Sequence, residues 1–82
     1  MIRKLMIKDE ENWSKLYNGY ADFYKVPMNK EILDTLWGWI HDDNHIVNGI
    51  CFELEGKIAG IAHYRTMPRP IKGQYIGFLD DL

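Results

Sequence analysis

Along the first half of the chain, apolar residues recur at the three- and four-residue spacing that is typical of helices. The first stripe predicts a helix that begins after Asp9, where an N-cap residue belongs, and that continues through acidic Glu10 and Glu11. We expect it to end at Val26-Pro27, because the residue before a proline avoids the α region. Its apolar side chains are Trp13, Leu16, Tyr17, Tyr20 and Tyr24.

A second stripe predicts a second helix, for which Asn29 is the candidate N-cap. Its apolar residues are Ile32, Leu33, Leu36, Trp39 and Ile40, and Trp37 lies at the margin of the stripe. Gly38 inside this helix costs about 1 kcal/mol relative to alanine, so we interpret it as a point of close approach or as an early loosening of the helix. The polar segment from His41 to His45 is then an exit loop.

The remaining chain follows the period of strands. A short strand is expected over residues 1–7, and a hairpin is expected with strands over residues 50–54 and 57–66 around a turn at Glu55-Gly56. Two prolines predict a loop over residues 67–73. The final strand, from Gln74 to Leu82, carries bulky apolar residues on both faces, which is typical of a central, buried strand. The order β-α-α-β-β-β predicts one α+β domain over residues 1–82 with a mostly antiparallel sheet.

Two adjacent carboxylates, Asp80 and Asp81, interrupt the apolar final strand. Because successive side chains of a strand point to opposite faces, we expect at least one of them to enter a region without water. A carboxylate there must be paired, hydrogen-bonded or used in chemistry. The alternative is a solvated strand end or an ordinary salt bridge.

Charge and composition narrow the class of protein. The net charge is −2 and the ten Lys and Arg residues are scattered, which argues against a nucleic-acid surface. The single cysteine, Cys51, excludes an internal disulfide, fits a reducing compartment and is expected to pack as a small apolar residue. No apolar run is long enough for a signal peptide or a membrane span. We therefore expect a cytoplasmic protein with no membrane partner.

Histidines offer two further candidate sites. His41 and His45 with the intervening aspartates could ligate a metal only on a continuing helix, and no third ligand is evident, so we predict no metal site. His63, on an apolar strand, is either a hydrogen-bonded structural residue or a contact for a substrate.

Two segments resemble a known family. The stretch G-K-I-A-G-I-A, from Gly56 to Ala62, is similar to the third strand of GNAT-type N-acetyltransferases, and Y-I-G-F-L-D-D-L, from Tyr75 to Leu82, is similar to the fourth. The resemblance implies the N-terminal part of a single GNAT domain that uses acetyl-CoA. The sequence ends before the R/Q-x-x-G-x-G/A motif that binds the pyrophosphate in this family, so we expect the 82 residues alone to be inactive.

The resemblance also implies roles for individual residues. Asp80 matches a position that often serves as base or water anchor, Asp81 is its neighbour, and Leu82 begins the backbone run that contacts pantetheine. The acceptor, a small primary amine or a polyamine, would contact Tyr20, Tyr24, Trp37, His63 and Tyr64. The alternative is a non-catalytic half-domain. An exposed edge on the final strand predicts, in addition, a homodimer through the edge of the sheet.

Overall fold

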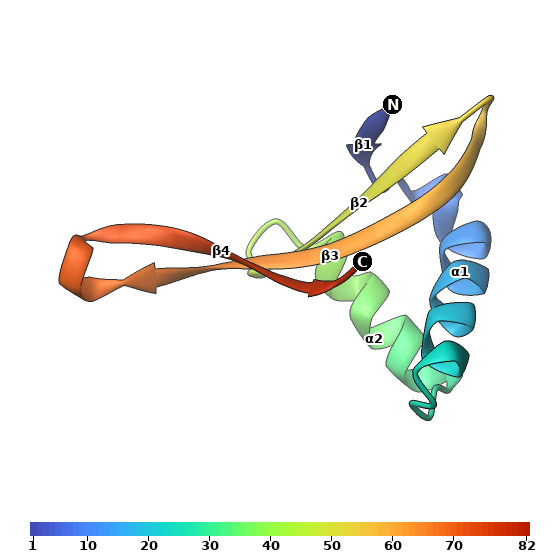
Figure 1. The fold of residues 1–82 in the computed structure, drawn as a ribbon, viewed down its shortest axis with the longest axis horizontal. Coiled ribbons are helices and arrows are strands. Elements are labelled where there is room, and N and C mark those ends of the chain that lie inside the picture. Colours follow the sequence, from blue (N-terminus) through green and yellow to red (C-terminus); the bar gives the residue numbers. More distant parts are fainter.

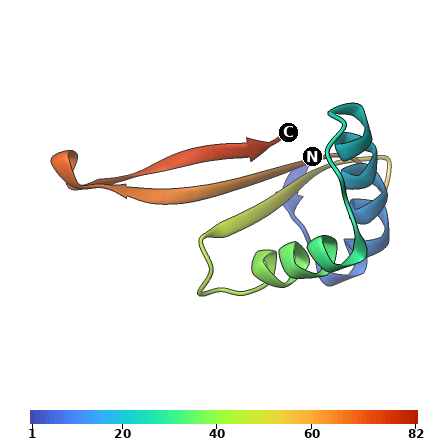
Figure 2. The same ribbon diagram turned by 90° about the horizontal axis from the view of Figure 1, so that it is seen from below.

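Four antiparallel strands form one sheet in the order β1-β2-β3-β4, and two helices pack against one end of it (Figures 1 and 2). The computed structural model describes residues 1–82. The strands are β1 (Ile2–Lys4), β2 (Val47–Leu54), β3 (Lys57–Arg69) and β4 (Gln74–Asp81), and the helices are α1 (Glu10–Phe23) and α2 (Lys30–Ile40). The predicted α+β class and element order are confirmed, and the arrangement is compatible with part of a GNAT-like fold.

β1 is shorter than the strand predicted over residues 1–7, because Asp9 turns the chain. Its carboxylate accepts the Met6 N–H at 2.7 Å, and residues Ile7–Asp9 form a 3₁₀ turn. Arg3 donates two hydrogen bonds to the same carboxylate, at 2.7 and 3.1 Å, and a third to Glu53. Asp9 therefore does not cap α1 with its side chain as predicted; it ties β1 to the start of the helix.

α2 begins as predicted, since the Asn29 side chain accepts the Ile32 N–H at 2.9 Å. The buried face of the helix is rotated relative to the prediction. Trp37 is buried, with its ring centroid 4.6 Å from that of Trp13, whereas Trp39 is 44% exposed. The stripe on the core is Leu33, Leu36, Trp37 and Ile40.

The β2–β3 hairpin turns at Glu55-Gly56 as predicted, with positive φ angles of 53° and 80°. Cys51 of β2 is buried in the core beside Leu5, Trp13 and Trp37, as expected of a small apolar side chain. Burial raises the pKa of its thiol.

β3 continues to Arg69, through the first three residues of the segment predicted as a loop. Beyond Arg65 it no longer pairs with β2, and only β4 lies beside it. Pro68, which has no N–H, is therefore tolerated opposite Tyr75 in a two-stranded ribbon with a free side. The strand pairing is interrupted only at Pro70–Lys72, which form a 3₁₀ turn, and at Gly73, whose φ is 60°.

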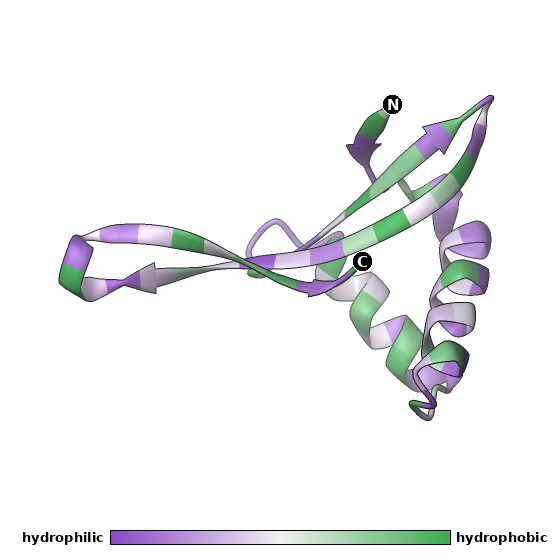
Figure 3. Cartoon of the chain, viewed as in Figure 1, coloured by the Kyte–Doolittle hydropathy of each residue, from purple (hydrophilic) through white to green (hydrophobic).

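β4 is an edge strand, which corrects the prediction of a buried central strand. It pairs only with β3, and Tyr75, Phe78 and Leu79 are exposed. The ribbon extends far from the helices, with hydrophilic and hydrophobic stretches alternating along it, before its end returns to them (Figures 1 and 3). The radius of gyration, 13.7 Å, accordingly exceeds the roughly 12 Å expected of a compact domain of this length.

No helix of the structure is long and apolar enough to cross a membrane.

Replacement by alanine is expected to have opposite effects on stability at Gly49 and Gly38. A Cβ on Gly49 would lie 2.8 Å from Leu5 Cδ1 and 3.1 Å from Ile40 Cγ2. A Cβ on Gly38 would meet nothing within 4 Å, which excludes the first of our two interpretations of Gly38, a point of close approach. Gly49→Ala should therefore lower the free energy of unfolding by about 1–3 kcal/mol. Gly38→Ala should raise it by up to about 1 kcal/mol, because alanine favours the helix. Urea denaturation measures both, and equal stability of the two variants would contradict the packing at Gly49.

Candidate active site

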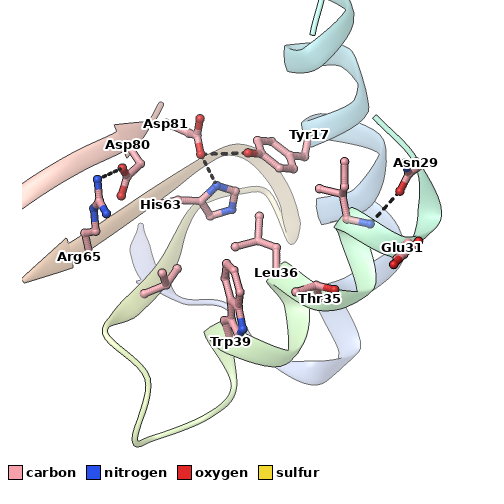
Figure 4. A pocket seen from close by; sticks show the side chains of 12 residues that line it. Tyr17, Asn29, Glu31, Thr35, Leu36, Trp39, His63, Arg65, Asp80 and Asp81 are labelled. Carbon is pink, nitrogen blue, oxygen red and sulfur yellow. Dashed lines mark hydrogen bonds and ion pairs between the residues drawn. The ribbon is translucent and has the colours of Figure 1, made fainter. Parts of the chain in front are cut away.

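A cleft of about 770 Å³ opens between the helices and the β3–β4 ribbon (Figure 4). Its helical wall combines apolar side chains, among them the exposed Trp39, with the polar Asn29 and Thr35 and the acidic Glu31; its strand wall carries His63, Arg65 and both aspartates. The lining residues are Tyr17, Asn29, Glu31, Ile32, Thr35, Leu36, Trp39, Val47, His63, Arg65, Asp80 and Asp81. The cleft thus combines an apolar surface with convergent charges, as small-molecule sites usually do.

A β-bulge places both aspartates on this cleft. In the register of β3 and β4, His63 lies opposite Asp81 while Tyr64 lies opposite Leu79, so Asp80 is the extra residue. A bulge interrupts the alternation of side chains. Asp80 and Asp81 therefore both line the cleft and do not point to opposite faces as predicted.

Asp81 is held by a chain of hydrogen bonds that leads into the core. Its Oδ2 accepts the Tyr17 hydroxyl at 3.0 Å and lies 3.0 Å from His63 Nδ1 (Figure 4). On the other side of the imidazole, Trp13 Nε1 donates to His63 Nε2 at 2.9 Å. Trp13 and His63 are each only 1% exposed, so water does not compete for the bond between them.

These contacts determine the protonation state of His63. The indole N–H can only donate, so His63 Nε2 accepts and the ring proton lies on Nδ1, from which it is donated to Asp81. Burial lowers the pKa of His63, against the opposing effect of the Asp81 carboxylate. His63 is therefore neutral, and it orients Asp81 as a carboxylate.

The tyrosines beside Asp81 stay protonated. Burial first, and the Asp81 charge and hydrogen bond second, raise the pKa of Tyr17 well above its usual range. The same two causes raise the pKa of Tyr20. Tyr17 is thus a hydrogen-bond donor to Asp81 and not a base.

Asp80 has a different partner. Arg65 Nη2 lies 3.2 Å from Asp80 Oδ1, and the guanidinium carbon lies 5.0 Å from the centroid of the Phe78 ring. The Arg65 Nε–H is buried and has no hydrogen-bond partner. One acid is therefore neutralised by a cation, whereas the other is bound only by neutral donors.

The substrate-contact residues predicted from the sequence are distributed over the molecule. Tyr20 and Tyr24 line a smaller pocket of about 260 Å³ that shares Tyr17 and Asp81 with the cleft. Trp37 lies in the core and Tyr64 lines no pocket, and these two positions give no support to their predicted roles. His63 lines the cleft as a buried residue and contacts Asp81.

Leu82, the predicted cofactor contact, is 79% exposed and borders an apolar groove. The groove is formed by Ile2, Leu16, Tyr20, Ile50, Cys51, Phe52, Gly60, Ile61 and Ala62 together with Leu82. The roles of all these residues remain predictions.

Three residues of the site were missed from the sequence. Trp13 and Tyr17 were assigned to an apolar stripe, although a buried indole N–H or phenol O–H needs a polar partner. That requirement, together with the polar residues His63 and Asp81 on apolar strands, could have indicated that these side chains bond to one another. Arg65 was taken as ordinary surface charge, and nothing in its local sequence indicated the pairing across β3 and β4.

The structure brings no three His, Cys, Asp or Glu side chains together as metal ligands. His41 and His45 follow α2 in the loop, where the His45 ring stacks on Trp39 with an interplanar angle of 8°. His45 Nδ1 accepts the Val47 N–H, so this ring helps to shape the turn into β2.

Comparison with known proteins gives one distant likeness. No protein-family profile matches the chain. The whole chain is 27% identical over 84 aligned residues to a D-amino-acid N-acetyltransferase of the yeast Saccharomyces cerevisiae. The chain spans about half of that protein, 52% of its length. The sequence is thus distantly similar to an N-acetyltransferase.

Trp13→Phe tests the assigned state of His63. In the unsubstituted chain the folded-state pKa of His63 lies below the unfolded value near 6.5, so stability should be full above that pH and decline as the pH falls below it. The phenylalanine variant has no donor to Nε2, so the imidazolium becomes easier to form beside Asp81, and its pKa should rise. NMR titration of the His63 ring nitrogens measures this. Trp39→Phe, on the exposed side of α2, is the control, and an unchanged pKa in Trp13→Phe would refute the assignment.

Proposed function

We propose that this chain provides the amine-binding side of an N-acetyltransferase, which transfers an acetyl group from acetyl-CoA to a primary amine. The observation that carries the proposal is Asp81, a carboxylate that lines the cleft, whose Oδ2 accepts from the neutral Tyr17 and His63 while 21% of its side chain stays exposed. The distant likeness to a yeast N-acetyltransferase supports the same chemistry.

The reaction requires an ammonium group to be bound and then to lose a proton. Acetyl-CoA supplies a thioester, so that a C–N bond forms at its carbonyl carbon, the C–S bond breaks, and CoA leaves as the thiol. Asp81 would bind the ammonium and accept its proton, directly or through a water molecule, and return that proton to solvent. A primary amine, with three N–H groups when protonated, matches a partly exposed carboxylate that no Lys or Arg side chain pairs with.

The hydrogen bonds favour Asp81 over Asp80 as the base. Arg65 Nη2 lies 3.2 Å from Asp80 Oδ1, so Asp80 already has a cationic partner within the protein. Asp81 has only neutral donors, and the Trp13–His63 pair fixes its orientation from below. The resemblance pointed to Asp80 in this role; the geometry supports its neighbour.

The residues present also fit part of acetyl-CoA. β4 pairs on one side only, so backbone N–H and C=O groups along its outer edge can hydrogen-bond an extended ligand that carries amide groups. The pantetheine arm is such a ligand. The stretch from Asp80 to Leu82 would hold it beside Asp81.

Asp81→Asn tests the proposal in the full gene product that carries these residues, assayed for acetyl-CoA-dependent thiol release with primary amines and D-amino acids. Loss of the base should lower kcat/KM by about 10²–10⁴-fold. The residual rate should rise with pH, because only amine that has lost its proton to solvent can react.

Asp80→Asn is the matched comparison and should lower kcat/KM by less than about tenfold. Far-UV circular dichroism verifies the folding of both variants. The proposal fails if no amine is acetylated, or if Asp81→Asn reacts like the unsubstituted protein.

The open edge of β4 favours a second candidate, a non-catalytic module that dimerises. Tyr75, Phe78 and Leu79 are exposed on a strand with one unpaired side, which is a template for pairing with a second copy. Such a dimer would place two β4 strands side by side.

Light scattering on the isolated 82-residue chain tests the dimer. The chain should double in mass with increasing concentration, and Ile76→Lys should weaken association at least tenfold, because charge on an edge strand opposes pairing. Ile71→Lys, in the exposed turn of the ribbon, is the control. A chain that stays monomeric at millimolar concentration rules the dimer out.

A further inference from the structure

A smaller pocket shares Tyr17 and Asp81 with the main cleft. Its walls come from the end of α1 and from the segment that leads to α2. The lining residues are Tyr17, Tyr20, Ala21, Tyr24, Val26, Met28 and Asp81, and we refer to this as the tyrosine pocket. Asp81 is its only residue that is charged at neutral pH.

Local backbone bonds hold the tyrosine pocket in shape. The Tyr24 N–H bonds to the Tyr20 carbonyl at 3.1 Å, and the Val26 N–H reaches back to the Ala21 carbonyl at 2.8 Å. Lys25, at φ 56°, makes the reversal between these two contacts. The wall formed by Val26 is therefore anchored to the helix.

Aromatic rings form one side of the pocket as a continuous row. The Tyr17 and Tyr20 rings are stacked with centroids 5.8 Å apart, and the Tyr20 and Tyr24 centroids are 4.8 Å apart. Ala21, Val26 and Met28 complete an apolar wall. A ligand here would exchange water for rings and methyl groups, and would meet one carboxylate.

Size and charge together define the ligand. An apolar cavity of about 150 Å³ is sufficient to bind benzene, so the tyrosine pocket, at about 260 Å³, can take a ring or a chain of five or six carbons. We propose that it binds the apolar body of the acceptor, so that the substrate is a primary amine with an uncharged aryl or alkyl group. This inference rests on the proposed function, since Asp81 binds the amine in both.

The pocket disfavours a polyamine, the other acceptor expected from the sequence. In the tyrosine pocket a second ammonium would meet no second carboxylate, because Asp80, which is paired with Arg65, and Glu31 line the main cleft and not this pocket. Burying an unpaired cation is costly, because the cation loses its water and gains no partner. An apolar body has no such cost and is stabilised there by every methylene that leaves water.

The experiment compares phenethylamine with propylamine and 1,6-diaminohexane as acceptors for the full gene product. We expect kcat/KM for phenethylamine to exceed that for each of the others at least tenfold. Tyr24→Ala should reduce the ratio of phenethylamine to propylamine about tenfold; Tyr24 is 59% exposed, so the core is spared. Phe23→Ala, one position away at 78% exposure and outside the pocket, should leave the ratio unchanged.

A binding measurement separates this inference from the proposed function. Phenethylamine should shift the methyl NMR signals of Val26 and Met28, and Tyr24→Ala should weaken that binding. Binding without acetylation of any amine would support the pocket and overturn the proposed function. Acetylation with equal kcat/KM for the three amines, or with a preference for the diamine, would overturn the pocket and leave the function standing.

Discussion

The carboxylate of Asp81 joins the strand at the edge of the sheet to the helical layer. β4 has a neighbour on one side only, and most of its length is exposed. At its end, one oxygen atom accepts from Tyr17 of α1 and from His63 of β3. Both donors are neutral, so the negative charge is bound without being neutralised. A carboxylate that is held by neutral donors can still attract a cation. The same carboxylate therefore connects β4 to the helices and remains available to bind a cation.

The geometry of this link depends on a one-residue irregularity in the sheet. Without the bulge at Asp80, regular alternation would send Asp80 and Asp81 to opposite faces. With it, both acids face the cleft and acquire different partners, Arg65 for one and His63 with Tyr17 for the other. Two identical side chains in adjacent positions thereby become electrostatically distinct.

Local sequence patterns predicted the helices and strands well, but they did not predict which elements pack against one another. The Asn29 cap and the Glu55-Gly56 turn depend on residues within three positions of each other, and the structure confirms both. The rotation of α2 was wrong, because Trp37 and Trp39 are equally apolar and only the position of Trp13 decides which is buried. β4 was misplaced for a related reason: an apolar run does not reveal whether a strand has one neighbour or two.

The Trp13–His63 hydrogen bond joins residues 50 positions apart and the Tyr17–Asp81 bond joins residues 64 positions apart, and no spacing rule indicates either contact. The sequence did single out Asp80, Asp81 and His63 as chemically informative, because a polar group on an apolar strand needs a partner. It could not supply the partner, since that depends on how α1 lies over β3.

The contact between His63 and Asp81 also closes a loop, because 18 positions separate them and the ribbon lies between. The entropy of closing a loop grows only with the logarithm of its length, so four more residues at the tip would add about 0.2 kcal/mol. Added in pairs, one to each strand, they would preserve the facing of every side chain below them. The length of the β3–β4 ribbon can therefore change while Asp81 stays in place. The ribbon is free to diversify in evolution independently of the cleft at its base.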